Sequence, residues 1–137
     1  VSYGADFDTH DNHTNRYPTL MRDLDAALGT FLTDVEHRGL AGEVLVATIS
    51  EFGRRVPDNG SSGLDHGAAS TALVLGPVRP GVHGEMPSLR HFDDNGNLIA
   101  TVNMNEYYAM LAQQWLGVRA DLVLSGAPHP LEGVSAV

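Results

Sequence analysis

The sequence predicts an α/β fold in which helices cover both faces of a mostly parallel sheet, and three observations lead to this prediction. Two short and nearly continuous apolar runs, at 43–50 and 71–75, have the pattern of strands that are buried on both faces. Segments with helical spacing of apolar residues precede the first run and follow the second. The resulting order of strand, helix, strand, strand and helix contains no short hairpin turn, which favours a layered α/β arrangement.

Length and composition limit the domain organisation and the partners. With 137 residues, of which 42% are hydrophobic and 18% charged, residues 1–137 can form one compact domain at most. The formal net charge of −9 is spread without a basic cluster, so we expect no nucleic-acid partner. No apolar run approaches the ~20 residues that cross a bilayer, and no signal peptide stands at the start, so we expect no membrane span.

The absence of cysteine restricts the chemistry further. The chain has no cysteine, which excludes disulfides, zinc–thiolate sites and a cysteine nucleophile. Any bound metal must therefore use histidine, carboxylate or carbonyl ligands. The chain also starts at Val1 without an initiator methionine and runs directly into a polar stretch, so we expect that it enters in the middle of a fold.

The first half of the chain is predicted to hold a strand, a helix and a buried strand. Residues 1–8 are β-tolerant and end in a polar loop. Apolar residues recur at helical spacing from 17 to 38, with Pro18 in the first turn and Gly39 after the end. The apolar run at 43–50 follows as a central parallel strand.

The second half is predicted to be less regular. Residues 51–67 form a loop rich in glycine and asparagine, and 71–75 form a second buried strand. Residues 77–97 are irregular, with a turn at Asn95-Gly96. A last helix is predicted from Asn105, which can cap it, to Leu116, and Gly117 ends it.

The densest group of potential ligands is Asp8-Thr9-His10-Asp11-Asn12-His13, at the expected carboxyl end of a strand. Ligands bind at this edge of open α/β sheets. Imidazoles and carboxylates suit a divalent transition metal, and donors on one short loop lose little entropy when a site forms. The same residues are also ordinary for a solvated turn, so the pattern alone leaves both interpretations open.

Two further groups follow in the chain. Glu51 comes directly after the first apolar run, where its carboxylate would point into the same crevice, although it can equally pair with Arg54 or Arg55. Asp65-His66 is flanked by Gly63 and Gly67, which allow close approach of the backbone to a ligand. Each of these signals is weak alone.

The three groups together resemble the bacterial family called domain of unknown function 1501. The resemblance rests on Phe7-Asp8-Thr9-His10, Ser50-Glu51-Phe52-Gly53-Arg54-Arg55, Asn59-Gly60-Ser61 and Asp65-His66-Gly67. It covers nearly all of the chain, but only the C-terminal part of the family's usual length. It implies an alkaline-phosphatase-like fold of the sulfatase superfamily, of which this chain is an incomplete portion. It also implies export by a twin-arginine signal, and hence a periplasmic or secreted protein.

The resemblance also implies a set of metal ligands. Asp8, His10 and His66 would bind one divalent ion, whether zinc, manganese, calcium or magnesium, and Glu51 would help to hold a second ion. The superfamily normally has an Asp-His pair at that place, but Phe52 follows Glu51 here, so sites with one ion and with two both stay open. A rival alignment takes Asp65 and His66 as the pair and His83 as the last ligand.

We therefore expect a metal-dependent hydrolase of phosphate or sulfate esters. Glu51 and Arg54 are the predicted catalytic residues, because an arginine fork such as that of Arg54 or Arg55 can bind an oxygen of an anionic substrate. The nucleophile would lie outside this chain, and the N-terminal half of the same protein or another chain would complete the fold. The alternative is a non-catalytic metal-binding or assembly module that keeps the fold.

Overall fold

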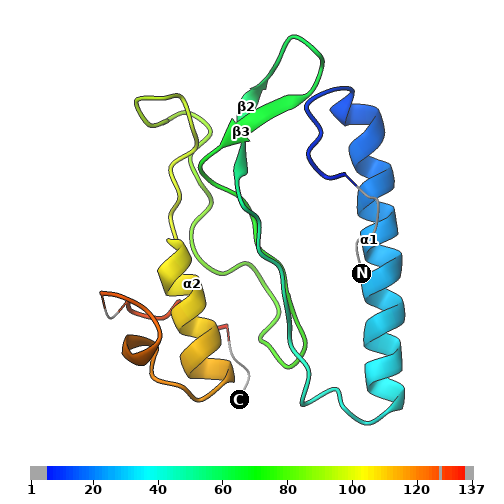
Figure 1. The fold of residues 1–137 in the computed structure, drawn as a ribbon, viewed down its shortest axis with the longest axis vertical. Helices are drawn as coiled ribbons and strands as arrows, with labels where there is room; N and C mark the ends of the chain where they lie inside the picture. The colour runs from blue at the N-terminus through cyan, green and yellow to red at the C-terminus, as the bar shows by residue number, and fades with distance from the viewer. Residues whose placement is uncertain (1–5, 127, 135–137) are drawn as a thin grey trace.

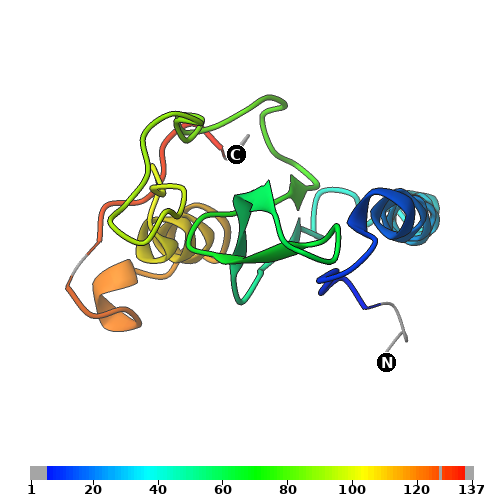
Figure 2. The ribbon, with the colours of Figure 1, turned by 90° about the horizontal axis from the view of Figure 1, so that it is seen from above.

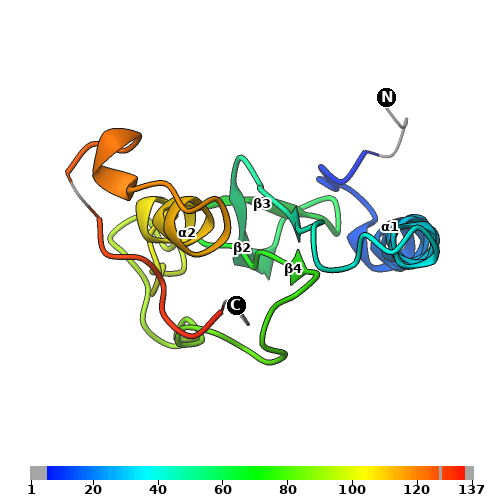
Figure 3. The same ribbon diagram turned by 90° about the horizontal axis from the view of Figure 1, so that it is seen from below.

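The computed structural model describes residues 6–126 and 128–134, and its strands lie between two helices in each of the three views (Figures 1, 2 and 3). In chain order the elements are α1 (His13–His37), β1 (Val46–Ala47), β2 (Gly53–Asp58), β3 (Leu64–Gly67), β4 (Val74–Leu75) and α2 (Met104–Met110). A π-helical turn (Leu111–Trp115) continues α2, and a 3-10 turn (Ala120–Leu122) follows. The strand predicted for 1–8 lies largely outside the described residues, and residues 6–8 form no strand.

The two apolar runs share a sheet as predicted, but only 46–47 and 74–75 form strands, and the prediction of a parallel sheet is wrong. β1 and β4 form an antiparallel pair in which Val46 faces Leu75 and Ala47 faces Val74. The physical reason is the connection between them: β2 and β3 form an antiparallel hairpin that turns the chain back on itself. Parallel pairing would need a crossover, usually a helix, and residues 51–71 supply none. The structure is thus mixed α/β, with two separate two-stranded sheets.

The β2–β3 hairpin replaces the loop predicted for 51–67. Gly53 pairs with Gly67, Arg54 with His66, and Asp58 with Leu64, with an irregularity between the first two pairs and the third. Glycine is required at both ends of the first pair. A Cβ atom on Gly53 would lie 1.7 Å from the carbonyl oxygen of Ala69, and one on Gly67 would lie 2.6 Å from the carbonyl carbon of Arg54.

Helix α1 begins four residues earlier than predicted, so Pro18 lies inside the helix and not in its first turn. The N-cap residue Asn12 makes no side-chain capping bond. Instead the amides of Asn12 and His13 donate to the carbonyl oxygens of Ser61 and Ser62 at 3.1 and 2.9 Å. Hydrogen bonds to the hairpin therefore provide acceptors for these two backbone amides at the start of the helix. At its other end, Gly39 has a φ of +71°, as a residue that follows a helix often does.

Helix α2 packs against the β1–β4 pair and forms the small core. Tyr107, Met110 and Val134 are buried together, with Ala47 and Val74 packed against them. The cap of the helix lies two residues earlier than predicted: Asn103, and not Asn105, is the N-cap, in a reciprocal capping box with Glu106. Gly117 follows its π-helical extension with a φ of +64°, as predicted.

The segment between β4 and α2 is irregular, as predicted for 77–97. Its turn at Asn95-Gly96 is present: Gly96 has a φ of +77°, and an isolated bridge joins Phe92 to Leu98 on either side. Among the described residues, no helix has the length and apolar character that crossing a membrane requires.

Candidate metal centre

Three side chains from two distant parts of the sequence meet at the hairpin end of the molecule. The Oδ1 atom of Asp8 lies 3.0 Å from Nε2 of His66 and 3.1 Å from Nε2 of His10, and the two Nε2 atoms are 2.9 Å apart. Among the described residues, these three form the group of potential metal ligands that the structure brings together. Each side chain is a little over 40% exposed, at 43%, 44% and 46%, so the group faces solvent.

The donor set fits a divalent transition metal. If an ion lies ~2.1 Å from each of three donor atoms that are ~3.0 Å apart, the donor–ion–donor angles are about 90°. A tetrahedral ion at the same distance would need donor atoms about 3.4 Å apart. Two imidazole nitrogens and a carboxylate suit zinc or manganese better than calcium or magnesium, which prefer oxygen ligands. Two nitrogen lone pairs cannot face each other at 2.9 Å, so a cation or a proton belongs between them.

The loop that carries Asp8 and His10 is held against the hairpin by backbone bonds. The amide of Leu64 donates to the carbonyl oxygen of Thr9 at 3.3 Å. Thr9 itself is fully buried, and its hydroxyl lies 2.5 Å from Nδ1 of His13 in the first turn of α1. The side chain between Asp8 and His10 therefore anchors the loop to the helix. The sequence alone indicated no role for Thr9.

Asn59 links the hairpin turn to the loop that carries His10 and to Asp65 on β3. Its amide nitrogen donates to the carbonyl oxygen of His10 at 2.9 Å and to Oδ1 of Asp65 at 3.0 Å. Its Oδ1 atom accepts from the amides of Ser61 and Gly63. Asn59 belongs to the Asn-Gly-Ser motif noted in the sequence, but no role was predicted for it. An Asn-Gly pair is a strong hairpin signal, which would have identified this turn.

Arg54, a predicted catalytic residue, lies beside Asp8. Its Nη2 atom donates to Oδ1 of Asp8 and, at 3.3 Å, to the carbonyl oxygen of Phe7. Its Nη1 atom donates to the carbonyl oxygen of Leu64 at 2.6 Å. Desolvation raises the pKa of Asp8, but hydrogen bonds from His66 and Arg54 and the nearby positive charges outweigh it, so the pKa lies below its usual value.

Phe52, the residue that departs from the expected Asp-His pattern, covers one side of His66. The two rings are stacked, with centroids 3.5 Å apart and planes 14° apart. The guanidinium carbon of Arg54 lies 5.0 Å from the centre of the Phe52 ring. Position 52, where the expected pattern has a histidine, therefore holds an aromatic ring, and its stacking fixes the plane of the His66 imidazole.

Asp65, a predicted metal ligand, lies behind the group and not within it. Its Oδ1 atom is 3.5 Å from Nδ1 of His10, the nitrogen opposite to the one that faces His66. A hydrogen bond from Asn59 is the main cause that lowers the pKa of the Asp65 carboxyl, and His10 contributes in the same direction. A carboxylate at Nδ1 favours the tautomer whose Nε2 lone pair is free for a metal.

The structure does not bring the other predicted ligands to this group. Glu51 is exposed and lines an apolar cavity beside α2. His83, the last ligand in the rival alignment, also lines that cavity, and its Nε2 atom lies 3.0 Å from the carbonyl oxygen of Arg79. Of the two alternatives, the described structure therefore assembles the set of Asp8, His10 and His66.

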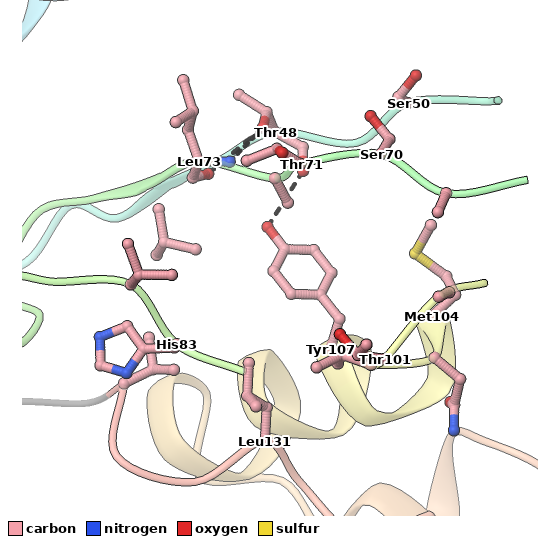
Figure 4. A pocket seen from close by; sticks show the side chains of 18 of the residues that line it. Thr48, Ser50, Ser70, Thr71, Leu73, His83, Thr101, Met104, Tyr107 and Leu131 are labelled. Atoms are coloured by element: carbon pink, nitrogen blue, oxygen red, sulfur yellow. Dashed lines mark hydrogen bonds between the residues drawn. The ribbon is translucent and has the colours of Figure 1, made fainter. Parts of the chain in front are cut away.

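The apolar cavity has a volume of ≈ 480 Å³ and lies between the β1–β4 pair, α2 and the 78–87 segment (Figure 4). Tyr107 points across it from α2, and its hydroxyl donates to the carbonyl oxygen of Thr48 at 3.1 Å. Around it, Val82 and Met86 are 81% and 77% exposed. The cavity is lined mainly by carbon atoms, so it suits apolar groups better than a charged ester.

Comparison with known protein families gives a match over most of the chain. Residues 1–110 match the model of a family described as "Protein of unknown function (DUF1501)". No curated protein and no solved structure matches the chain.

Proposed function

Because the chain belongs to the DUF1501 family, and because two histidines and an aspartate meet in it, we propose that it carries the metal centre of a hydrolase of phosphate or sulfate esters. The observation that supports this most is the triangle of donor atoms 2.9–3.1 Å apart. The triangle faces solvent, which leaves coordination positions for water and substrate.

Asp8, His10 and His66 are the residues that would hold the cation, which we propose to be zinc or manganese. When bound, such a cation polarises an ester oxygen and neutralises the charge that develops on it. The residues of the chain supply the rest of the site. Asp65 orients His10, and Phe52 limits rotation of the His66 ring. Asn59 holds the ligand loop, by which we mean the loop that carries Asp8 and His10, against the hairpin.

We propose one cation and not two at the part of the site that this chain provides. Glu51, the predicted ligand of a second ion, is not in the group of donors that the described structure brings together. Its catalytic role stays a prediction, and so does substrate binding by Arg54. The nucleophile in this proposal lies outside the chain.

A non-catalytic metal-binding or assembly module is the second candidate, and one observation favours it. The Asp8 oxygen that faces both histidines also accepts a hydrogen bond from Arg54. A guanidinium at that oxygen neutralises the carboxylate and reduces the negative charge available to a catalytic cation. Such a site can hold a structural ion without turnover.

We also propose that a further segment, from the same protein or from another chain, covers the β1–β4 pair and the apolar cavity. The two runs have the composition of strands buried on both faces, yet Ile49 is 60% and Leu73 is 41% exposed. Exposed apolar surface of this extent commonly marks an interface.

The family resemblance supports export, so we propose that the protein acts in the periplasm or outside the cell. Cell fractionation with an antibody to this chain tests the proposal. Recovery of the protein from the cytoplasm alone would contradict it.

The decisive experiment measures metal content and hydrolysis on the protein at its full natural length. Elemental analysis should find one transition-metal ion per chain, and aryl phosphate or aryl sulfate should be hydrolysed by the metal-loaded protein but not after chelation. His66→Ala should lose both metal and activity, whereas His91→Ala, at an exposed histidine outside the group, should keep both. Metal without hydrolysis would favour the non-catalytic module, and protein without metal would refute both candidates.

A further inference from the structure

Arg54 sits where three segments of the site meet. Its side chain is only 20% exposed, although arginine side chains are mostly exposed. Through Nη2 it contacts Asp8 and the carbonyl oxygen of Phe7, and through Nη1 the carbonyl oxygen of Leu64. The guanidinium therefore links strand β2, the ligand loop and the start of β3.

In all of these contacts the guanidinium donates hydrogen bonds to groups of the protein itself. A guanidinium binds the two oxygens of an anion through a pair of nitrogens, either Nη1 with Nη2 or Nε with Nη2, so both arrangements need a free Nη2. Here one terminal nitrogen is directed to a ligand carboxylate and a carbonyl oxygen, and the other to a second carbonyl oxygen. The guanidinium also lies over Phe52, the ring that stacks on His66.

Arg55 is the natural comparison. It is the next residue of the same strand and carries the same charge, but it is exposed. Successive side chains of a strand point to opposite faces, so Arg55 points away from the face on which Arg54 reaches Asp8.

We propose that Arg54 is a positioning residue, which holds Asp8 and the Phe52–His66 pair in place before a cation binds, and does not bind the substrate. This inference rests on the proposed function for its metal-binding part. Its structural part, the junction of loop, β2 and β3, stands without a metal.

The first test therefore uses metal-free protein at its full natural length. Hydrogen exchange should be about tenfold faster at the amides of Leu64, Asn12 and His13 in Arg54→Met than in the parent protein. These amides donate from the hairpin to the loop and from the start of α1 to the hairpin. Arg55→Met, which removes the same charge one residue away, should leave their exchange unchanged.

The second test loads the same proteins with Co²⁺, whose visible spectrum reports ligand geometry. Arg54→Met should raise the dissociation constant of Co²⁺ by about 10- to 100-fold and alter the spectrum, as loss of a group that orients a ligand does. Arg54→Lys, which keeps the charge, should recover part of the affinity. Arg55→Met, whose charge acts on Asp65 and not on Asp8, should change the affinity less than Arg54→Met does. Binding of inorganic phosphate or sulfate to the metal-loaded protein should not depend on Arg54 once Co²⁺ is saturating.

The outcomes separate this inference from the proposed function. If the parent protein binds no Co²⁺, the proposed function fails, and hydrogen exchange alone decides the role of Arg54. If Arg54→Met leaves hydrogen exchange, Co²⁺ affinity and spectrum unchanged but loses phosphate or sulfate binding, Arg54 binds substrate and the inference is overturned. Tighter Co²⁺ binding by Arg54→Met would also overturn it, since the arginine would then compete with the cation for Asp8.

Discussion

The Nε2 atoms of His10 and His66 lie 2.9 Å apart, although 56 positions separate the two residues in the sequence. Their rings are inclined by 40°, with centroids 4.7 Å apart, so both nitrogens point to the same space beside Asp8. Backbone bonds between the loop that carries His10 and the hairpin bring the two histidines together.

Removal of any one of the three ligands should abolish tight metal binding. We expect His10→Ala, His66→Ala and Asp8→Ala each to weaken Zn²⁺ binding by more than about 100-fold, since two donors hold an ion much less firmly than three. Competition with a chromophoric chelator measures the effect. Binding that survives in His10→Ala at the parent affinity would show that the ion lies elsewhere.

Asp65→Asn should weaken metal binding less than loss of a ligand does. The amide still fills the space at Nδ1 of His10, but it no longer selects the tautomer, so we expect a loss of about 10-fold. Asp58→Asn makes the same change at an exposed position at the end of β2 and should have no effect. A loss as large as that of His10→Ala would mean that Asp65 is itself a ligand, as the sequence predicted.

Gly63→Ala should destabilise the site strongly, because the hairpin turn touches the ligand loop there. A Cβ atom on Gly63 would lie 2.1 Å from both the carbonyl carbon and the oxygen of His10. We expect a loss of about 3 kcal/mol in the free energy of unfolding. Gly60→Ala in the same turn meets nothing within 4 Å, and should change stability by less than about 0.5 kcal/mol. Equal unfolding midpoints of the two variants in urea would contradict the close approach of turn and loop.

Residues 1–137 expressed alone should associate or exchange their amide hydrogens rapidly. The apolar side chains of Ile49, Leu73 and Val82 are exposed, and each sheet has two strands in the described part of the chain, which is marginal for independent stability. Light scattering and hydrogen exchange in dilute solution provide the measurement. A monodisperse and strongly protected monomer would refute the proposal that a further segment covers this surface.

Which residues lie close together was predicted more successfully from the sequence than the direction of the strands. Asp8, His10 and His66 were expected at one cation because their motifs resemble a family pattern, and the structure brings them together. The apolar runs around Val46 and Val74 were expected to share a sheet, and they do. Strand direction could not be derived in the same way, since an apolar run indicates burial and carries no information about its neighbour's direction.

Other errors have local physical causes. The start of α1 was placed four residues late because carbonyl groups of Ser61 and Ser62, far away in the sequence, accept its first amide hydrogens. The roles of Asn59 and Thr9 depend on contacts between the loop and the hairpin, which no periodicity reveals. Asp65, a ligand only in the rival alignment, lies outside the group of three in the described structure, since neighbouring residues of a strand point to opposite sides, and its role as a ligand stays a prediction.

The three donors are divided between a loop before α1 and strand β3 after it, so a cation bound as we propose would link metal supply to the stability of the protein. A cation held by both segments stabilises only the conformation in which they touch, by about 4 kcal/mol when free metal exceeds the dissociation constant 1,000-fold. When metal is scarce, that contribution disappears and the hairpin and loop separate more often. Proteases cleave opened chains, so under the proposed function metal starvation would lower the amount of this protein as well as its metal content.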